Sequence, residues 1–514
     1  MPGFLFEKPF PGATSGIVIG PLTAADLAPL IRLRHLQWWV DGDGLGRRPN
    51  AFDRHGNVET VRIDQLPATE LRAKIERFLG RDPRHLPSVF VTTDTQDENR
   101  ADYATGIEQI TAVLSSNHVA RETRQKDGFT WQKHVLQNIP ALVHRRLPSA
   151  WRDAFRGQPA FVCGAGPSLD VTAPLLSRVA NRGVVLAADS AQRALTRHGV
   201  KVDFTVSVDA AKHPEKCLPA DSLPGNVVLS SVSPPAWRDA LPVERCFFLS
   251  APQVTEGWLS SHGITPAAVA VRENCGGTAL ELARFLGCAP IYLFGLDLAV
   301  DTSNPSLRHN AAVDATIYTH SGFNPTQPLP TVPGNYSDRV PTFAAADWRA
   351  LDERIAGWPS DLVYNINDRG ARFRNTLLVH PKDFTLVSMA SDETAVTVDL
   401  SGPEAPDRSA LNTIGAELMM TAEQASRQVA PMHAALSAHG SAGVAPLFRQ
   451  FLTDRNNAQI FGAFSFKLMP HLLPPAEGDD VFWRTCIEEF DQLAQIATAS
   501  AKGLLEHAPS ESVG

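Results

Sequence analysis

Short apolar runs alternate with amphipathic stretches through the middle of the chain, between residues 130 and 385. The apolar runs predict buried strands, and the spacing of apolar positions after them predicts helices. We expect strands at 160–163, 184–188, 204–208, 226–230, 246–249 and 290–294, and helices at 168–180, 190–198 and 278–287. Near-continuous apolar strands separated by helices indicate a parallel sheet covered on both faces. The predicted fold class is therefore α/β, with a Rossmann-like, doubly wound, mostly parallel sheet as its core.

The two ends of the chain have a different pattern. Residues 1–115 are irregular, with a helix expected at 67–80, a strand at 87–93, and turns in the polar, glycine-rich stretch 37–57. From about residue 405 the strand pattern is lost and long helical periods follow. We therefore expect an N-terminal α/β accessory region (1–115), a catalytic core (116–390), and a C-terminal helical domain (391–514) for partner binding or dimerisation.

Composition narrows the class of protein. The chain is 43% hydrophobic and carries a net charge of −8, which argues against a nucleic-acid partner because phosphate backbones attract basic surfaces. No apolar run is long enough to span a membrane, and no secretory signal opens the sequence. The six cysteines form no C-x-x-C pair, so neither a zinc site nor a disulfide framework is expected. The expected location is the cytoplasm.

A glycine-rich turn follows the first strand of the core, in the stretch AFVCGAGPSLD (160–170). Gly164 and Gly166 allow a sharp turn and close backbone approach, and Pro167 suits the first turn of a helix. Backbone N–H groups and the helix dipole favour a phosphate there, and the Ser168 hydroxyl could cap the helix or bond the phosphate. Leu169 stands where G-x-G-x-x-G needs glycine, and no G-K-[ST] follows. A plain strand-to-helix turn remains the alternative.

Carboxylates follow the next two predicted strands, at Asp189 and Asp209. An acid after the second strand can bond ribose hydroxyls, and Asp209 could orient a sugar, act as a base or hold a metal. Either residue alone is more often a helix N-cap. Because carboxyl ends of parallel strands share one edge of a sheet, the glycine turn and both acids are expected to converge on a ligand site.

A second glycine-rich helix entrance lies in RENCGGTALELARFLGCAPIYLFGLD. Asn274, Gly276, Gly277 and Thr278 would open a helix whose N–H groups could hold another anion. The following strand ends near Asp297, a further acid at the same edge.

Together, GAGPSLD, AADS, VDFTVSVD and GGTALELARFLGCAPIYLFGLDLA resemble the core of the Maf (motility-associated factor) family, as do PGNYSDRVPT and VYNINDRGARF. That family is linked to O-glycosylation of bacterial flagellin with nonulosonic acids. Its core is shared with 6-hydroxymethylpterin diphosphokinase-like proteins. It is also similar to bacterial sialyltransferases that use CMP-sialic acid.

The resemblance implies transfer of a nonulosonic acid from a CMP-activated form to Ser or Thr of flagellin, with no cofactor required. The nucleotide would then be bound by Gly164, Ala165, Gly166, Ser168, Leu169, Asp189, Ser190, Asn274, Gly276, Gly277 and Thr278. The catalytic residues would be Asp209, Asp297 and His320. The loop 300–342 also offers His309, Tyr318, Tyr336 and Asp338 as the base.

Two alternatives stay open. One is a diphosphokinase that uses ATP and Mg²⁺, with Asp209 and Asp297 as ligands of the cation. The other is a flagellin-binding scaffold that keeps the fold without catalysis.

Overall fold

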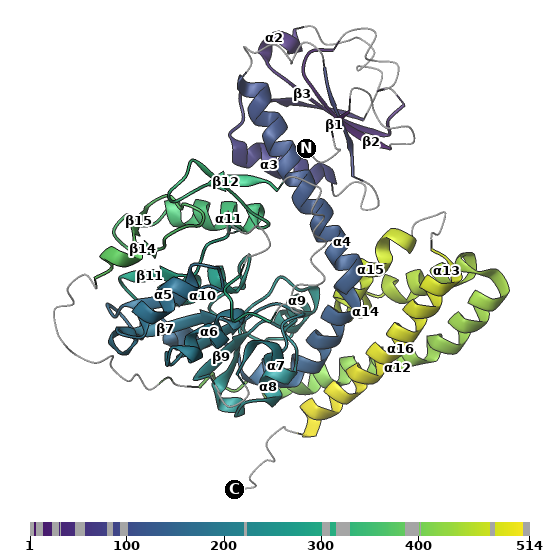
Figure 1. The fold of residues 1–514 in the computed structure, drawn as a ribbon. Coiled ribbons are helices and arrows are strands. Elements are labelled where there is room, and N and C mark those ends of the chain that lie inside the picture. The colour runs from purple at the N-terminus through teal and green to yellow at the C-terminus, as the bar shows by residue number, and fades with distance from the viewer. Residues whose placement is uncertain are drawn as a thin grey trace. The chain divides into compact units, whose positions relative to one another are not determined.

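The computed structural model describes residues 5–6, 14–22, 30, 32–46, 57–79, 86–92, 101–219, 224–300, 309–314, 329–385, 400, 402–472 and 478–506. The chain divides into two compact units (Figure 1). The first contains residues 1–127 and 466–477, and the second contains residues 128–465 and 478–514. Each unit is built on a parallel sheet.

The sheet of the first unit has the strand order β1-β5-β2-β3-β4, and all its neighbouring strands are parallel. Its strands are β1 (Leu5–Phe6), β2 (Ser15–Ile19), β3 (His35–Val40), β4 (Val58–Arg62) and β5 (Ser88–Val91). Its helices include α2 (Gly42–Leu45), α3 (Ala68–Leu79) and the first part of α4 (Ala101–His144). The helix and strand predicted near residues 67–80 and 87–93 are confirmed.

The prediction of turns from residue 37 onward is wrong at its start. Residues 37–40 belong to β3, and the side chains of Trp38 and Trp39 are both completely buried. Their alternate directions place them in separate apolar clusters on the two faces of the sheet. Glycines and aspartates follow this strand at once, so the sequence pattern of the stretch as a whole is that of a turn.

The second unit has an eight-stranded sheet with the order β10-β9-β8-β7-β6-β11-β14-β15, parallel throughout. Its strands are β6 (Ala160–Cys163), β7 (Val184–Ala188), β8 (Phe204–Ser207), β9 (Asn226–Leu229), β10 (Cys246–Phe248), β11 (Ile291–Phe294), β14 (Val363–Ile366) and β15 (Thr376–Val379). This sheet confirms the predicted doubly wound α/β fold. A short antiparallel hairpin, β12 (Thr331–Pro333) with β13 (Arg339–Pro341), stands apart from it.

Helices cover both faces of this sheet because successive strand residues point to opposite sides. On one face, Ala160 and Val162 pack with α10 (Cys275–Phe285) and α11 (Ala345–Ala356). On the other face, Phe161 and Cys163 pack with α5 (Leu169–Leu176) and α6 (Gln192–Arg197). Such continuous burial explains why the strands are apolar along their whole length.

The order of the strands reverses between β6 and β11. From β6 the chain moves outward through β7, β8, β9 and β10, and then returns to place β11 on the other side of β6. In open parallel sheets, ligands bind beyond the carboxyl ends of the strands at such a switch point. The glycine turn after β6 lies at this position.

Apart from residues 466–477, which belong to the first unit, the C-terminal helices belong to the same compact unit as the eight-stranded sheet. They are α12 (Arg408–His439), α13 (Ser441–Thr453), α14 (Arg455–Ile460), α15 (Gly462–Leu472) and α16 (Asp480–Glu506), and α12 packs along α16 (Figure 1). Buried polar contacts join them to the core. The side chain of Gln132 in α4, for example, donates to Ile460 O (2.7 Å) and accepts from the backbone of Ala463 (2.7 Å).

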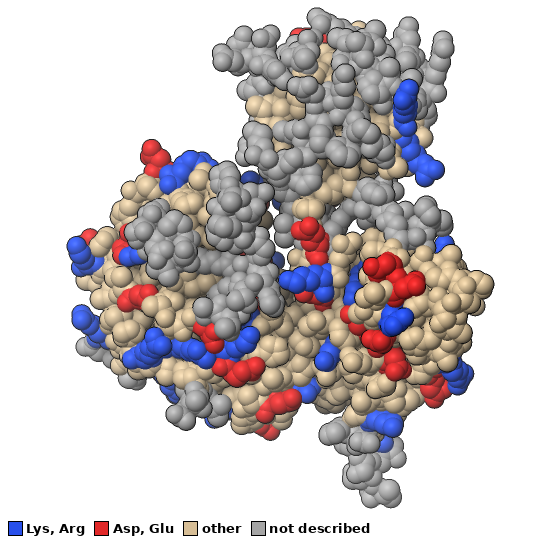
Figure 2. Space-filling view, turned by 45° about the vertical axis from the view of Figure 1, so that its right-hand side comes forward, with Lys and Arg blue, Asp and Glu red and all other residues tan. Residues whose placement is uncertain are grey.

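All six cysteines are free thiols. No helix within the described ranges is both long and apolar enough to cross a membrane. Figure 2 shows acidic and basic side chains intermixed on the face that it draws.

Candidate functional site

The carboxyl edge of the eight-stranded sheet gathers the residues singled out in the sequence. Gly164 follows β6, Asp189 follows β7, Asp209 lies two residues after β8, and Asp297 lies three residues after β11. Because the strands are parallel and adjacent, these loops share one edge. The prediction that the glycine turn and these acids share one edge of the sheet is therefore confirmed, and the ligand site stays a prediction.

The two glycines of the turn after β6 are needed for close packing. A Cβ on Gly164 would lie 2.5 Å from the carbonyl oxygen of Gly295, and one on Gly166 would lie 2.5 Å from the Asp297 carboxylate. The backbone N–H of Gly166 also donates to Gly295 O (2.7 Å). The turn after β6 is thus fitted against the turn after β11.

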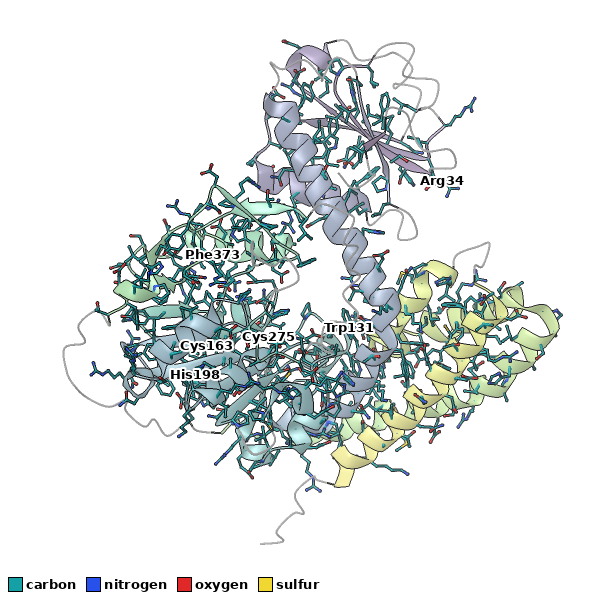
Figure 3. All side chains as sticks on the ribbon, viewed as in Figure 1. Arg34, Trp131, Cys163, His198, Cys275 and Phe373 are labelled. Carbon is teal, nitrogen blue, oxygen red and sulfur yellow. The ribbon has the colours of Figure 1, made fainter. Side chains whose placement is uncertain are left out.

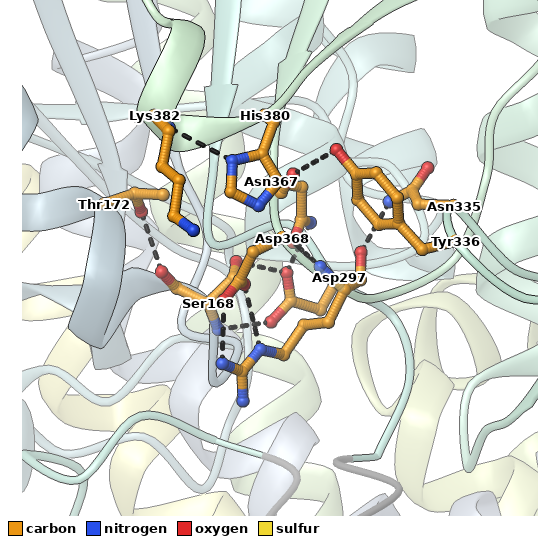
Figure 4. Close-up of polar contacts among 10 residues, drawn as sticks. Ser168, Thr172, Asp297, Asn335, Tyr336, Asn367, Asp368, His380 and Lys382 are labelled. Carbon is orange, nitrogen blue, oxygen red and sulfur yellow. Dashed lines mark hydrogen bonds and ion pairs between the residues drawn. The ribbon is translucent and has the colours of Figure 1, made fainter.

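Asp297 is the buried anion of this edge, with only 2% of its surface exposed. It accepts the backbone N–H of Ser168 (2.7 Å), the Ser168 hydroxyl (2.5 Å) and the side-chain amide of Asn367 (2.7 Å), as Figure 4 shows. Burial raises the pKa of Asp297, while these hydrogen bonds and Arg369 oppose the rise. Both oxygens face protein donors, so Asp297 does not fit the Mg²⁺ ligand considered from the sequence.

The Ser168 and Leu169 side chains also differ from expectation. Ser168 makes no side-chain cap of α5, because its hydroxyl donates to Asp297 instead. Leu169 is completely buried in the apolar cluster on that face of the sheet. Ala165 lies at the tip of the turn, where its carbonyl oxygen accepts the backbone N–H (2.9 Å) and side-chain amide (3.0 Å) of Asn310.

These contacts bring the described segment 309–314 against the glycine turn. His309 directly precedes Asn310, the residue that contacts the turn. His320 and Tyr318 lie outside the described residues. Of the two histidines that the sequence offered as a base, His309 is the one whose place is known.

A second polar cluster, the Asp189 cluster, follows β7 and consists of Asp189, Ser190, Ser207, Lys212 and Cys275. Asp189 accepts the backbone N–H (2.6 Å) and hydroxyl (2.9 Å) of Ser190, the Ser207 hydroxyl (2.8 Å) and the Cys275 thiol (3.5 Å). The ammonium of Lys212 donates to Ser190 Oγ (2.7 Å) and lies 3.9 Å from Asp189. The cluster therefore places a buried cation beside a buried anion.

Lys212 and Ser207 were missed in the sequence. Lys212 is only 8% exposed, which is rare for a lysine and requires polar partners. The signal available was its position three residues after Asp209, in the same loop. Asp209 itself is exposed, and its carboxylate accepts the backbone N–H of Ala211 (2.9 Å).

Cys275, which is labelled in Figure 3, opens α10 and joins the entrance of this helix to the Asp189 cluster through its thiol. Burial, with the nearby Asp189 carboxylate, raises the pKa of the Cys275 thiol well above its ordinary value. Asn274 caps the helix by accepting from Gly277 N (2.8 Å). The Thr278 hydroxyl is completely buried and donates to Asn274 O (2.8 Å), so it is engaged within its own turn.

The side-chain amide of Asn274 also donates to Asp347 (3.0 Å), in the first turn of α11. Burial, with a smaller contribution from Glu273, raises the pKa of Asp347 to about 6. Sequence patterns gave no sign of this carboxyl. Gly276 packs closely on Leu296, where a Cβ would lie 2.5 Å from its Cδ1.

The loop after β14 and the turn of the β12–β13 hairpin complete the edge. The Tyr336 hydroxyl donates to Asn367 O (3.0 Å), and Asn335 donates to Arg369 O (2.6 Å) and Gly370 O (3.0 Å). Burial, Asp368 and Asp383 raise the pKa of Tyr336, whose ring is half exposed. Figure 4 shows this group around Asp297.

No cluster of three or more His, Cys, Asp or Glu side chains is placed to hold a metal ion in the described part of the chain. The edge instead gathers hydroxyls, amides, backbone N–H groups and one buried ammonium beside the glycine turn, most of them hydrogen-bonded within the protein. Such groups can bind and orient a phosphorylated ligand.

Comparisons with known proteins agree with the sequence resemblance. Residues 133–303 match the family model described as 6-hydroxymethylpterin diphosphokinase MptE-like. The structure is similar to that of a Maf glycosyltransferase from Magnetospirillum magneticum AMB-1, with a TM-score of 0.50 and 15% identity, over 97% of this chain and 80% of that one. A search of curated proteins found no match. The predicted resemblance to Maf proteins with an MptE-like core is thus confirmed, and at this identity the structural match establishes the fold.

Proposed function

We propose that this protein is a glycosyltransferase that moves a nonulosonic acid from its CMP form to a Ser or Thr hydroxyl of flagellin. The observation that carries the proposal is the pairing of a whole-chain Maf-like fold with a glycine turn at the switch point of its sheet. The six free thiols are consistent with a cytoplasmic enzyme. Flagellin would be the protein acceptor, and the parts outside the matched core offer surfaces for it.

In the proposed reaction, the bond between the anomeric carbon and the phosphate oxygen breaks, and CMP leaves as an anion. The acceptor oxygen forms the new bond to the anomeric carbon and gives its proton to a base. Positive charge at the edge of the sheet stabilises the leaving phosphate. The entrance of α10 and the Lys212 ammonium are the groups of this chain that would supply it.

Two described residues are candidates for the base. Asp209 presents an exposed carboxylate at the edge, and His309 lies beside the glycine turn. His320, which the sequence favoured, stays a prediction. Asp297 is the least suited of the predicted catalytic residues, because its carboxylate is enclosed by donors.

A second candidate function has one observation in its favour. The description of the matched family model points to a 6-hydroxymethylpterin diphosphokinase, which would bind ATP with Mg²⁺. The two functions differ in the nucleotide that the same edge would hold.

Melting temperatures of the full chain with CMP, CDP, UDP, ATP and GTP, each with and without Mg²⁺, separate them. A ligand at one hundred times its Kd stabilises the folded state by about 2.7 kcal/mol, which raises the melting temperature measurably. We expect CMP to give a selective increase without Mg²⁺. A selective, Mg²⁺-dependent increase with ATP would replace this proposal with the diphosphokinase.

A further inference from the structure

Asp297 lies where the loops after three adjacent strands meet. Because β11 is between β6 and β14, a residue after β11 can contact the glycine turn on one side and the loop 367–370 on the other. Close approaches are seen on both sides. A Cβ on Gly166 would lie 2.5 Å from the Asp297 carboxylate, and one on Gly370, whose φ is +77°, would lie 3.0 Å from the Asp297 Cα.

The donors around Asp297 have fixed directions. The backbone N–H of Ser168 can only donate, and it faces Oδ2. The side chain of Asn367 donates to Oδ1, and its orientation is set because its own oxygen accepts the backbone N–H of Arg369 (3.0 Å). Residue 297 must therefore accept at both of its terminal atoms, which a carboxylate can do and an amide cannot.

The same contacts reach the hairpin turn. The carbonyl oxygen of Asn367 accepts from the Tyr336 hydroxyl, and Asn335 holds the neighbouring backbone of Arg369 and Gly370. One buried side chain thus connects the glycine turn, the loop after β14 and the turn that carries Tyr336.

We propose that Asp297 is a positioning residue, which fixes the glycine turn and the Asn367 loop in the shape that binds the nucleotide and neither transfers a proton nor binds a metal. This inference rests on the proposed function, because the turn that Asp297 fixes lies at the switch point of the sheet where the CMP-sugar is proposed to bind.

The first variant is Asp297→Asn, which keeps the size of the side chain but places an N–H group against a donor. We expect CMP to bind at least about tenfold more weakly, as loss of a hydrogen bond to a charged group implies. We also expect the backbone amides of Gly164, Ala165, Gly166 and Ser168 to exchange with solvent faster in the absence of ligand. The pH profile of the remaining transfer activity should not move.

The second variant exchanges the two side chains, as Asp297→Asn with Asn367→Asp. The amide introduced at position 297 can then donate to the carboxylate introduced at position 367 and to the Ser168 hydroxyl, while its oxygen still accepts from Ser168 N. That carboxylate also still accepts from Arg369 N. The Ser168 hydroxyl changes from donor to acceptor, and the other donors of this group regain acceptors, so CMP affinity and amide protection should return to within about threefold of the wild type, a non-additive rescue. Asp361→Asn is the control, an exposed residue before β14 at the opposite edge of the sheet.

Wild-type CMP affinity and amide protection in Asp297→Asn would overturn the proposal. So would intact CMP binding with lost transfer, which would make Asp297 a catalytic group, or a double variant no better than the single one. If the wild type does not bind CMP, the proposed function fails, while the amide exchange of residues 164–168 still decides whether Asp297 fixes the turn.

Discussion

At the scale of single residues, burial separates groups that hold the site from groups that can act in it. Asp297, Thr278 and Leu169 are almost completely buried, and the two polar side chains are engaged by protein partners. Asp209 is exposed at the same edge. A motif gives the residue type at a position, but whether its polar atoms face a ligand depends on which loops fold against it.

Lys212 is predicted to stabilise the CMP phosphate. Lys212→Ala should weaken CMP binding about ten- to a hundredfold, because a hydrogen bond to a charged group contributes about 1.5–3 kcal/mol. Binding of cytidine, which lacks the phosphate, should change little. Titration calorimetry with both ligands measures this difference, with the exposed Lys201→Ala before β8 as control. Equal losses for CMP and cytidine would mean that Lys212 only supports the fold.

Asp209 is predicted to act in the chemical step. Asp209→Asn should lower kcat for transfer by about 10²–10⁴, the usual contribution of a general base, with CMP affinity unchanged. The same measurements on His309→Ala compare the two candidate bases. If Asp209→Asn keeps full activity, the carboxylate of Asp209 has no catalytic role and only accepts the backbone N–H of Ala211 in its turn.

At the scale of elements, the sequence predicted the strands of the core better than their surroundings. All six predicted core strands are found within two residues, since buried parallel strands are apolar throughout. β14 and β15 of the same sheet were not predicted, nor were β1 to β4 of the first unit or the first part of α4, which begins at Ala101. The periodicity of hydrophobic positions is weak in short strands that lie beside glycines, and in long helices whose faces carry both polar and apolar residues.

The candidate site was predictable only in part, for a related reason. The glycine turn and the acids that end strands can be read from local order in the sequence. Lys212, Asn367 and Asp347 enter the site through loops and helix starts, and their contacts span up to 73 residues in the chain. Only the folded topology brings these residues to the same edge.

The starts of α10 and α11 are predicted to carry a pH-dependent contribution to stability. The pKa of Asp347 is raised from 3.8 to about 6 in the folded state, so the folded protein binds this proton more tightly than the unfolded chain does. Protonation of Asp347 therefore stabilises the folded state fully below pH 3.8, and this stabilisation is lost as the pH rises through 6. Asp347→Asn keeps an acceptor for Asn274 and removes the charge beside Glu273. It should raise the free energy of unfolding at pH 8 by up to about 2 kcal/mol.

Urea unfolding of the wild type and Asp347→Asn at pH 5 and pH 8 tests this prediction. The gain should be larger at pH 8 than at pH 5. Asp338→Asn, an exposed carboxyl in the hairpin turn, is the control. A gain independent of pH would show that Asp347 does not titrate near 6.

At the scale of the whole molecule, the C-terminal helices are joined to the sheet by buried polar contacts. Glu417 of α12 accepts from Trp258 (3.1 Å), His262 (3.0 Å) and Asn456 (3.0 Å), which lie in or beside α9 (Val254–Ser261) and α14. Apart from residues 466–477, the C-terminal helices and the sheet form one compact unit, although their sequence patterns differ. We therefore expect them to unfold together.

Glu417→Ala should lower the free energy of unfolding by about 2–3 kcal/mol, because it leaves the indole N–H of buried Trp258 and two partly buried donors without an acceptor. Glu423→Ala, which removes an exposed pair with Arg427 on the same helix, should cost no more than about 0.5 kcal/mol. Urea unfolding followed by circular dichroism gives both values. Equal losses of stability in the two variants, or separate unfolding transitions for the sheet and the helices, would show that the sheet and the helices do not unfold as one unit.

The central claim is transfer of a nonulosonic acid from a CMP-sugar to a protein hydroxyl. Its most direct test is the intact mass of flagellin after incubation with the full chain and CMP-activated sugar, with sugar omitted as the control. We predict mass increases equal to whole sugar residues and release of CMP in equal amount. Unchanged flagellin, from a chain that binds CMP-sugar and flagellin, would show that this edge of the sheet holds its ligands without transferring the sugar.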